Sequence, residues 1–251
     1  MMRVYRIEYQ GVPRHVVEEG GRWRLVEGDI FARWTPGDTL ADAPRHFLPP
    51  VLPSKIVAIG LNYREHAVEQ GKAVPGEPMM FLKPPTAVVG PGEAIVLPGW
   101  AGRIDHEAEV GVVIGRTARQ VGEADALTYV FGLTCVNDVT ARDLQKKDVQ
   151  YTRAKGFDTF APIGPCIATG LDVGSPIGIE GLVNGELRQS SSTADLIFGI
   201  PRLIAHISAV MTLLPGDIIS TGTPAGVGPL KPGDLVTVKI EGVGELTNPV
   251  R

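Results

Sequence analysis

Glycine and proline recur along the whole chain and divide it into short segments. Of 251 residues, 31 are glycine and 21 are proline. Glycine weakens regular elements and proline removes a backbone donor, so short strands joined by tight turns are favoured over long helices. No apolar run reaches the roughly 18 residues that a membrane span needs. With an ordinary hydrophobic share of 43%, the pattern predicts an α+β fold with a large mixed β core and few short helices.

Two units are expected along the chain. Residues 1–52 carry apolar and polar side chains in alternation around glycine turns, which predicts a small N-terminal β-rich domain. The prolines of 43–53 suit a semi-rigid linker, and the main domain is predicted over 53–251. Within it we expect strands at 56–60, 79–82, 94–97, 104–114, 128–137, 182–184, 218–220 and 235–240, and helices at 63–70, 140–147 and 201–214.

Charge and cysteine content argue against several classes of protein. Lysine and arginine (24) are fewer than aspartate and glutamate (28), which disfavours a broad nucleic-acid footprint. The N-terminus has neither the apolar stretch nor the cleavage site of a signal peptide. Cys135 and Cys166 form no disulfide framework, so a cytoplasmic location is expected. The motifs of serine hydrolases, zinc peptidases, P-loop proteins and Rossmann folds are missing from the sequence.

Segment 104–114 carries the first candidate for chemistry. Side chains alternate between the two faces of a strand, so Asp105, Glu107 and Glu109 are predicted to share one face. The apolar run after Glu109 indicates that the strand enters a core, where neighbouring carboxylates repel unless one is protonated or a cation lies between them. Glu107 and Glu109 are therefore candidate ligands of Mg²⁺, Mn²⁺ or Ca²⁺ rather than of zinc. The alternative is an exposed acidic edge strand.

Asp138 follows the strand predicted over 128–137 and precedes the helix predicted over 140–147. Its carboxylate either caps this helix or serves as a third metal ligand. Arg142 and Gln145 lie three residues apart, so they share a helix face and can meet one ligand. The alternative for this pair is a solvated polar face.

Two further segments are candidates for acid–base and anion chemistry. His66 and Glu69 lie one turn apart on the predicted helix 63–70, where the carboxylate can orient the imidazole as a general base, or form a surface ion pair. Lys155 precedes a glycine and an aromatic residue, and either reaches into a site or stays solvated. The glycine-rich segment 220–228 either offers N–H groups and hydroxyls to a carboxylate or is only a tight connection.

Seven segments, taken together and in order, resemble the fumarylacetoacetate hydrolase family over about residues 55–251. They are GLNYREH at 60–66, MFLKPPT at 80–86, DHEAE at 105–109, NDVTARD at 137–143, KGFDTF at 155–160, LVNGE at 182–186 and TGTPAGVG at 221–228. The resemblance implies a mixed β-roll or β-sandwich, bound Mg²⁺ or Mn²⁺, and a homodimer. The N-terminal unit is similar, more loosely, to the small leading domain of bacterial members.

The resemblance also implies a role for each matching residue. Glu107, Glu109 and Asp138 are the expected metal ligands. The expected catalytic residues are His66 and Glu69, as a water-activating or proton-shuttling dyad, and Lys155, which binds oxyanion oxygens. Substrate binding is assigned to Arg142, Gln145, Gly222 and Thr223, the last two at the substrate carboxylate.

This set predicts a metal-dependent enzyme that acts on 2-oxo or 2-hydroxy-dienoic acids through a metal-stabilised enolate. The preferred reaction is isomerisation of 2-hydroxyhepta-2,4-diene-1,7-dioate in aromatic-ring catabolism. The alternatives are acylpyruvate or fumarylacetoacetate-type C–C hydrolysis and oxaloacetate decarboxylation. A non-catalytic module that binds organic acids is the alternative of another class. The expected partner is a small dicarboxylate, with no nucleic acid and no membrane.

Overall fold

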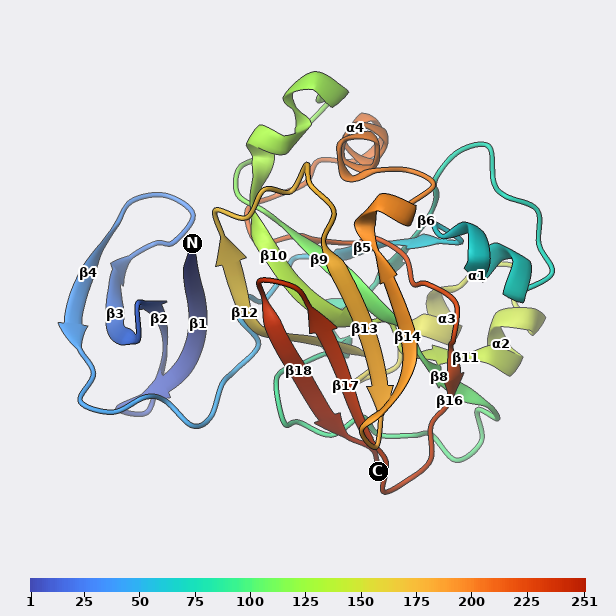
Figure 1. The fold of residues 1–251 in the computed structure, drawn as a ribbon, viewed down its shortest axis with the longest axis horizontal. Coiled ribbons are helices and arrows are strands. Elements are labelled where there is room, and N and C mark those ends of the chain that lie inside the picture. Colours follow the sequence, from blue (N-terminus) through green and yellow to red (C-terminus); the bar gives the residue numbers. More distant parts are fainter.

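The computed structural model describes residues 1–251 and is drawn in Figure 1. The strands are β1 (Met2–Tyr9), β2 (Val12–Glu19), β3 (Arg22–Gly28), β4 (Trp34–Thr39), β5 (Ile56–Gly60), β6 (Met79–Lys83), β7 (Val88–Val89), β8 (Ile104–His106), β9 (Ala108–Ile114), β10 (Val130–Asn137), β11 (Thr140–Ala141), β12 (Ala161–Thr169), β13 (Gly178–Val183), β14 (Glu186–Ser192), β15 (Ile218–Ser220), β16 (Gly228–Pro229), β17 (Leu235–Ile240) and β18 (Gly244–Pro249). The α-helices are α1 (Arg64–Glu69), α2 (Arg142–Lys147), α3 (Thr152–Lys155) and α4 (Ile200–Val210). Strands dominate and helices are short, which confirms the predicted α+β class.

The N-terminal strands β1 to β4 form an antiparallel meander at one side of the molecule (Figure 1). Its alternating side chains pack Tyr5 against Trp23 and Phe47, with ring centroids 4.8 Å apart in both pairs. Strand β1 pairs antiparallel with β12, so hydrogen bonds continue from the meander into the main sheet. The division of the chain at residue 52 stays a prediction.

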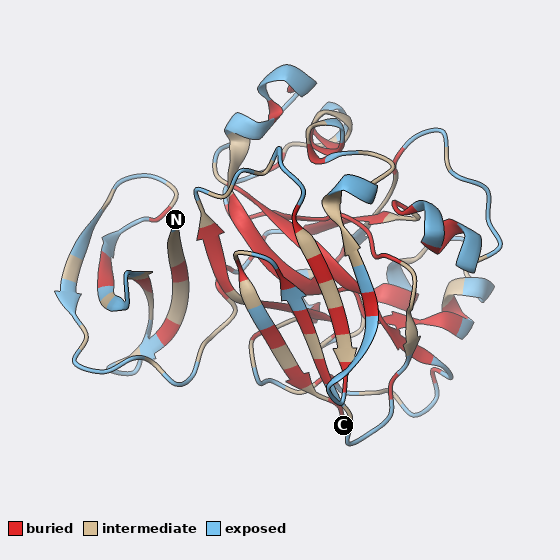
Figure 2. Ribbon diagram, viewed as in Figure 1, coloured by how far each residue is buried: buried red, intermediate tan, exposed pale blue.

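The main body is built on β9, which is buried along its whole length. Its alternation sends Val110, Val112 and Ile114 into the largest core cluster, together with residues of α4 and β17. Val113 points the other way, into a second cluster shared with β1, β5 and β15. A strand buried on both faces accounts for the uninterrupted apolar run that follows Glu109. Figure 2 shows the buried residues concentrated on the central strands and the exposed ones on the outer loops and helices.

Three sheets meet around this strand. The large sheet has the order β4-β3-β2-β1-β12-β10-β9-β15-β5-β6, and β7 pairs with β12. A four-stranded sheet has the order β14-β13-β17-β18, and a small sheet has the order β11-β8-β16. None of the helices is long and apolar enough to cross a membrane.

The single strand expected over 104–114 is divided at Glu107, and this expectation was wrong. Strand β8 belongs to the small sheet and β9 to the large one. At the division, the N–H of Glu107 donates to the side-chain oxygen of Asn137 at 3.0 Å rather than to a strand carbonyl. The chain therefore changes sheets between the two glutamates of the motif, and their spacing depends on side-chain contacts as well as strand pairing.

Other element boundaries also differ from the expectations. Residues 94–97 form no strand, and only a bridge joins Ile95 to Val250. Strands β12, β14 and β18 were not predicted, because β12 contains Pro162 and Pro165 and β14 is largely polar. Helix α4 ends at Val210, and α2 begins only at Arg142 since the two residues before it pair with β8.

Candidate active site

Three carboxylates at the start of β9 and the end of β10 meet at one point in the main body. Strands β9 and β10 run antiparallel with Val136 opposite Glu109, so the start of β9 lies beside the end of β10. One ligand oxygen each from Glu107, Glu109 and Asp138 lies within 4.8 Å of the other two, and all three side chains are buried. The structure thus brings together the three residues that were predicted as metal ligands.

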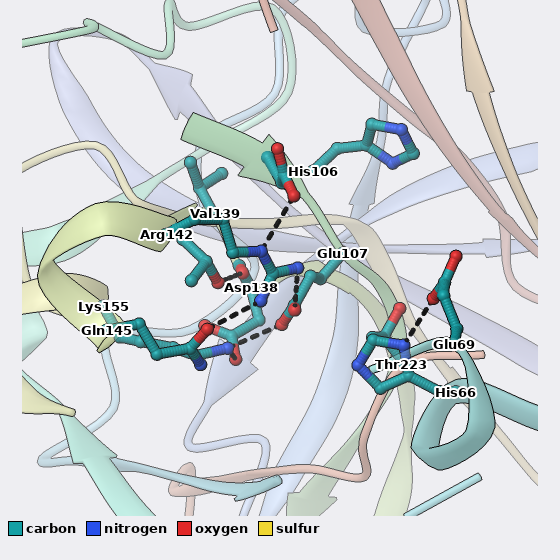
Figure 3. Close-up of polar contacts among 12 residues, drawn as sticks. His66, Glu69, His106, Glu107, Asp138, Val139, Arg142, Gln145, Lys155 and Thr223 are labelled. Carbon is teal, nitrogen blue, oxygen red and sulfur yellow. Dashed lines mark hydrogen bonds and ion pairs between the residues drawn. The ribbon is translucent and has the colours of Figure 1, made fainter. Parts of the chain in front are cut away.

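Two lysines reach these carboxylates from other elements. Lys155, at the end of α3, donates to Glu107 Oε2 at 2.6 Å and to Asp138 Oδ2 at 2.5 Å (Figure 3). Lys83, at the end of β6, donates to the other oxygen of Asp138 at 2.5 Å and is wholly buried. Burial lowers the pKa of Lys83, and Asp138 opposes that effect. Lys83 was not predicted as a site residue, although it lies in the MFLKPPT segment.

Arg142 connects the helix α2 to the acidic strand. Its guanidinium donates to Glu107 Oε1 at 2.5 Å, to Asp105 Oδ2 at 2.8 Å and to Gln145 Oε1 at 2.9 Å. Arg142 and Gln145 therefore share a face, as the three-residue spacing predicted. Burial alone would raise the pKa of Glu107, but Arg142 and then Lys155 outweigh it and hold that pKa well below its ordinary value.

Glu109 differs from the other two carboxylates because no lysine, arginine or histidine forms an ion pair with it. Its Oε2 accepts only from the Ser220 hydroxyl at 2.6 Å and the Gly222 N–H at 2.9 Å. Burial, followed by the charges of Asp138 and Glu107, raises its pKa well above the ordinary value. A divalent cation would relieve this repulsion, and three hard oxygen donors are the set that Mg²⁺ and Mn²⁺ prefer. The residues present thus fit such an ion.

The histidine and glutamate of α1 form a dyad beside these residues. His66 Nδ1 lies 2.8 Å from Glu69 Oε2 (Figure 3). The other oxygen of Glu69 accepts from the Gly226 N–H at 2.9 Å. An ionised carboxylate only accepts, so Nδ1 donates to Glu69, and in the neutral ring Nε2 is then the nitrogen without a proton. His66 is buried, whereas the Glu69 side chain is 31% exposed.

A single cavity joins most of the predicted residues. Those that line it are His66, Glu107, Glu109, Arg142, Gln145, Lys155 and Thr223. Three predicted residues do not line the cavity but form hydrogen bonds with residues that do: Glu69 with His66, Asp138 with Lys155, and Gly222 with Glu109. The aromatic wall formed by Phe81 and Tyr151 was not predicted, although Phe81 lies in a matching segment. The ammonium group of Lys155 lies 4.9 Å from the centroid of the Phe81 ring.

The two residues predicted to contact a substrate carboxylate are already engaged within the protein. The Gly222 N–H donates to Glu109, and the Thr223 hydroxyl donates to the carbonyl of Ala108 at 2.9 Å. The backbone N–H of Thr223 forms no hydrogen bond within the chain. Contact between Thr223 and a substrate anion would therefore use this N–H rather than the hydroxyl proton.

A buried carboxylate triad on a mixed β scaffold, opposite a His–Glu dyad, defines an acid–base enzyme with a candidate divalent-metal site. Residues 55–251 match the family model described as fumarylacetoacetate (FAA) hydrolase C-terminal. The chain belongs to this family and is an enzyme of its isomerase or hydrolase type. The predicted fold of the family is thereby confirmed.

Three relatives illustrate the range of the family. The chain is 44% identical to the 5-carboxymethyl-2-hydroxymuconate delta-isomerase from Mycobacterium smegmatis, whose crystal structure it matches with a TM-score of 0.92 over 99% of this chain and 98% of that one. The 2-hydroxyhepta-2,4-diene-1,7-dioate isomerase from Mycobacterium marinum is 42% identical, with a TM-score of 0.92 over 100% and 98%. The oxaloacetate tautomerase YisK of Bacillus subtilis is 38% identical, over 97% of this chain and 88% of its own.

Proposed function

We propose that this enzyme isomerises 2-hydroxy-2,4-dienoic diacids of the 2-hydroxyhepta-2,4-diene-1,7-dioate type, with Mg²⁺ or Mn²⁺ as its cofactor. The observation that carries the proposal is the shared cavity. Two carboxylates of the triad, two buried cationic side chains and the His66 ring line it, and the third carboxylate, Asp138, is bound to the lining residue Lys155. Two relatives of more than 40% identity bear the names of isomerases of this kind.

Charge balance around the cavity favours a dianionic substrate. Four carboxylates and four cationic side chains form a cluster around the triad, and their charges cancel when all eight are ionised. They are Asp105, Glu107, Glu109 and Asp138 on one side and Lys83, Arg103, Lys155 and Arg142 on the other. A bound divalent ion would bring the net charge of this cluster to +2, which would balance the two carboxylates of a diacid.

The chain's own groups supply the remaining requirements of the reaction. Glu107, Glu109 and Asp138 would hold the divalent ion, which when bound stabilises negative charge that develops on the 2-oxygen of the substrate. Arg142 and the backbone N–H of Thr223 donate to substrate oxygens.

His66 moves the proton in this proposal. Isomerisation removes the proton of the 2-hydroxyl group and adds one to a carbon of the diene, so the composition of the substrate is unchanged. The Nε2 atom of His66 can accept and return a proton because Glu69 keeps the ring proton on Nδ1. Glu69 is itself held by the Gly226 N–H, which fixes the orientation of the ring.

Two alternatives keep specific support. The same dyad can activate water, which leaves hydrolysis of a C–C bond in an acylpyruvate or fumarylacetoacetate-type substrate open. The relative named as an oxaloacetate tautomerase supports oxaloacetate as a substrate, since its enol–keto exchange needs the same proton transfer. A homodimer and a cytoplasmic location are further parts of the proposal.

A substrate panel tests the proposal. Purified enzyme is incubated with 2-hydroxyhepta-2,4-diene-1,7-dioate, oxaloacetate and an acylpyruvate, with Mg²⁺, with Mn²⁺ and in chelator, and products are identified by NMR. We expect the diene diacid to yield an isomer of equal mass only when a divalent ion is present. Cleavage products would replace this function by C–C hydrolysis, and binding without turnover of any substrate would indicate a non-catalytic module.

A further inference from the structure

Ala108, between the two glutamates of the triad, lies where one side of the strand ladder has ended. Strand β15 pairs with β9 only as far as Ser220 opposite Gly111. One step further, the Val110 carbonyl still accepts from the Thr221 N–H at 3.1 Å. The backbone N–H and C=O of alternate residues point to the same side of a strand, so those of Ala108 point to the same side as those of Val110. At Ala108, however, no backbone of a neighbouring strand lies opposite them.

Two side chains take the place of the missing strand. The Ala108 N–H donates to Oε1 of Gln189 at 3.0 Å, and its carbonyl accepts from the Thr223 hydroxyl at 2.9 Å. The amide nitrogen of Gln189 in turn donates to Thr223 Oγ1 at 2.7 Å and to the Pro224 carbonyl at 2.8 Å. Gln189 is fully buried on β14, in a different sheet from the strand that it supports.

The direction of every bond in this network is determined. An N–H of Ala108 can only donate and the Pro224 carbonyl can only accept, so the Gln189 amide has one possible orientation. His106 Nδ1, 3.1 Å from the same Oε1, must then be a donor. The side-chain oxygen of Gln189 thus accepts two hydrogen bonds and its nitrogen donates two, which is the most that an amide side chain can form. Figure 3 shows the His106 ring turned away from the carboxylates.

Close packing also ties the loop at Thr223 to this part of β14. A Cβ atom built on Gly226 would lie 2.0 Å from the Arg188 carbonyl oxygen and 3.3 Å from the Cα atom of Gln189. The loop therefore rests directly on the backbone of β14 with no side chain between them. The same Gly226 donates its N–H to Glu69 of the dyad.

We infer that Gln189 is a positioning residue that fixes the spacing of Glu107 and Glu109 and joins it to the position of Thr223. The inference rests on the proposed metal site, because the spacing matters only if both carboxylates bind one cation. Gln189 touches neither the cation nor the substrate, and acts through Ala108 and Thr223. Groups that orient metal ligands from behind typically change metal affinity by about 10–100-fold when they are removed.

The test compares Gln189→Ala with a matched control in chelator-treated protein. Asn248→Ala is the control, because Asn248 is equally buried and donates two hydrogen bonds, to the Gly90 and Glu93 carbonyls, away from the cavity. Mn²⁺ affinity is measured by titration calorimetry, and hydrogen exchange of the peptide around Ala108 is measured by mass spectrometry without metal. We expect Gln189→Ala to weaken Mn²⁺ binding at least about tenfold and to expose the Ala108 amide, whereas Asn248→Ala lowers only the melting temperature.

A second pair of variants decides the matter if Gln189→Ala does not fold. Thr223→Val keeps the volume but removes the hydroxyl that binds the Ala108 carbonyl, and Thr223→Ser restores it. Weaker Mn²⁺ binding in the valine variant with recovery in the serine variant supports the inference. Affinity within about twofold of wild type in folded Gln189→Ala or in Thr223→Val, or an equal loss in Asn248→Ala, overturns it. Wild-type protein that binds no divalent ion would instead refute the proposed function.

Discussion

Replacing Glu109 by glutamine should stabilise the metal-free protein and at the same time remove its divalent-cation site. Glu109 is buried, has no cationic partner and lies with its two acidic neighbours so that ligand oxygens are within 4.8 Å of one another. Two unit charges at this distance repel by about 3.5 kcal/mol at an effective dielectric constant of about 20. The cations around the other two carboxylates offset part of this energy.

The net gain in the free energy of unfolding is therefore expected to be about 1–2 kcal/mol. For a chain of this size, such a gain raises the melting temperature by about 2–8 °C. The glutamine oxygen can still accept from Ser220 and Gly222, so these hydrogen bonds are retained. Its new amide donor faces the remaining carboxylates, which adds attraction where there was repulsion.

Melting curves in chelator and with Mn²⁺ measure both effects. Wild-type protein at a Mn²⁺ concentration of about 100 times its Kd should gain about 2.7 kcal/mol, and Glu109→Gln should gain nothing. Glu186→Gln is the control, because Glu186 is an exposed glutamate, 71% accessible, outside the cavity. Its stability should stay within about 0.5 kcal/mol of wild type. A Glu109→Gln protein that melts below wild type in chelator, or that still responds to Mn²⁺, would refute this account of the triad.

Three further outcomes are expected. His66→Ala should lower kcat by about 10²–10⁴-fold while Mn²⁺ affinity, measured by calorimetry, stays near wild type; a parallel loss of affinity would place His66 among the metal ligands. Lys83→Met leaves one oxygen of Asp138 buried without its cation, so it should lower the free energy of unfolding by about 3 kcal/mol in denaturant titrations, and an unchanged midpoint would contradict this. Burial alone would raise the pKa of Glu107, but the cationic groups around it, Arg142 foremost, hold that pKa below its ordinary value of 4.5. The stabilisation that this ion pair gives the folded state should thus be complete above pH 4.5 and decline as the pH falls further. The difference in free energy of unfolding between wild type and Arg142→Met should therefore become smaller in acid.

The roles in the candidate site were predicted from the resemblance to the family, and local structure predicted which of its residues can meet as pairs. The helical spacing of Arg142 and Gln145 placed them on one face, and their side chains do meet at 2.9 Å. The spacing of His66 and Glu69 likewise gives a dyad at 2.8 Å. Such pairs depend only on neighbours in the chain, so a sequence pattern is enough to propose them.

Lys83 shows why other parts of the site could not be found in this way. It is separated from Asp138 by 55 residues, and its strand gives no sign that a buried lysine ends there. Gln189 is separated from Thr223 by 34 residues in an unremarkable polar strand. Contacts of this kind arise from the way the sheets pack, and no local period in the sequence encodes them.

By itself, the sequence determined the β-rich class of the fold, the carboxylate pair of the DHEAE segment and the dyad of the first helix. These features depend on turn residues, strand alternation and helical spacing, which act over only a few residues. Only the tertiary structure decided that Asp138 joins this pair and that Lys155 and Lys83 balance it, because these partners meet through strand pairing and burial. It also divided the predicted strand at Glu107 and assigned the Thr223 hydroxyl to the protein's own backbone. The physical reason is that a buried polar group must find a partner within the fold, and the fold alone determines which groups are within reach.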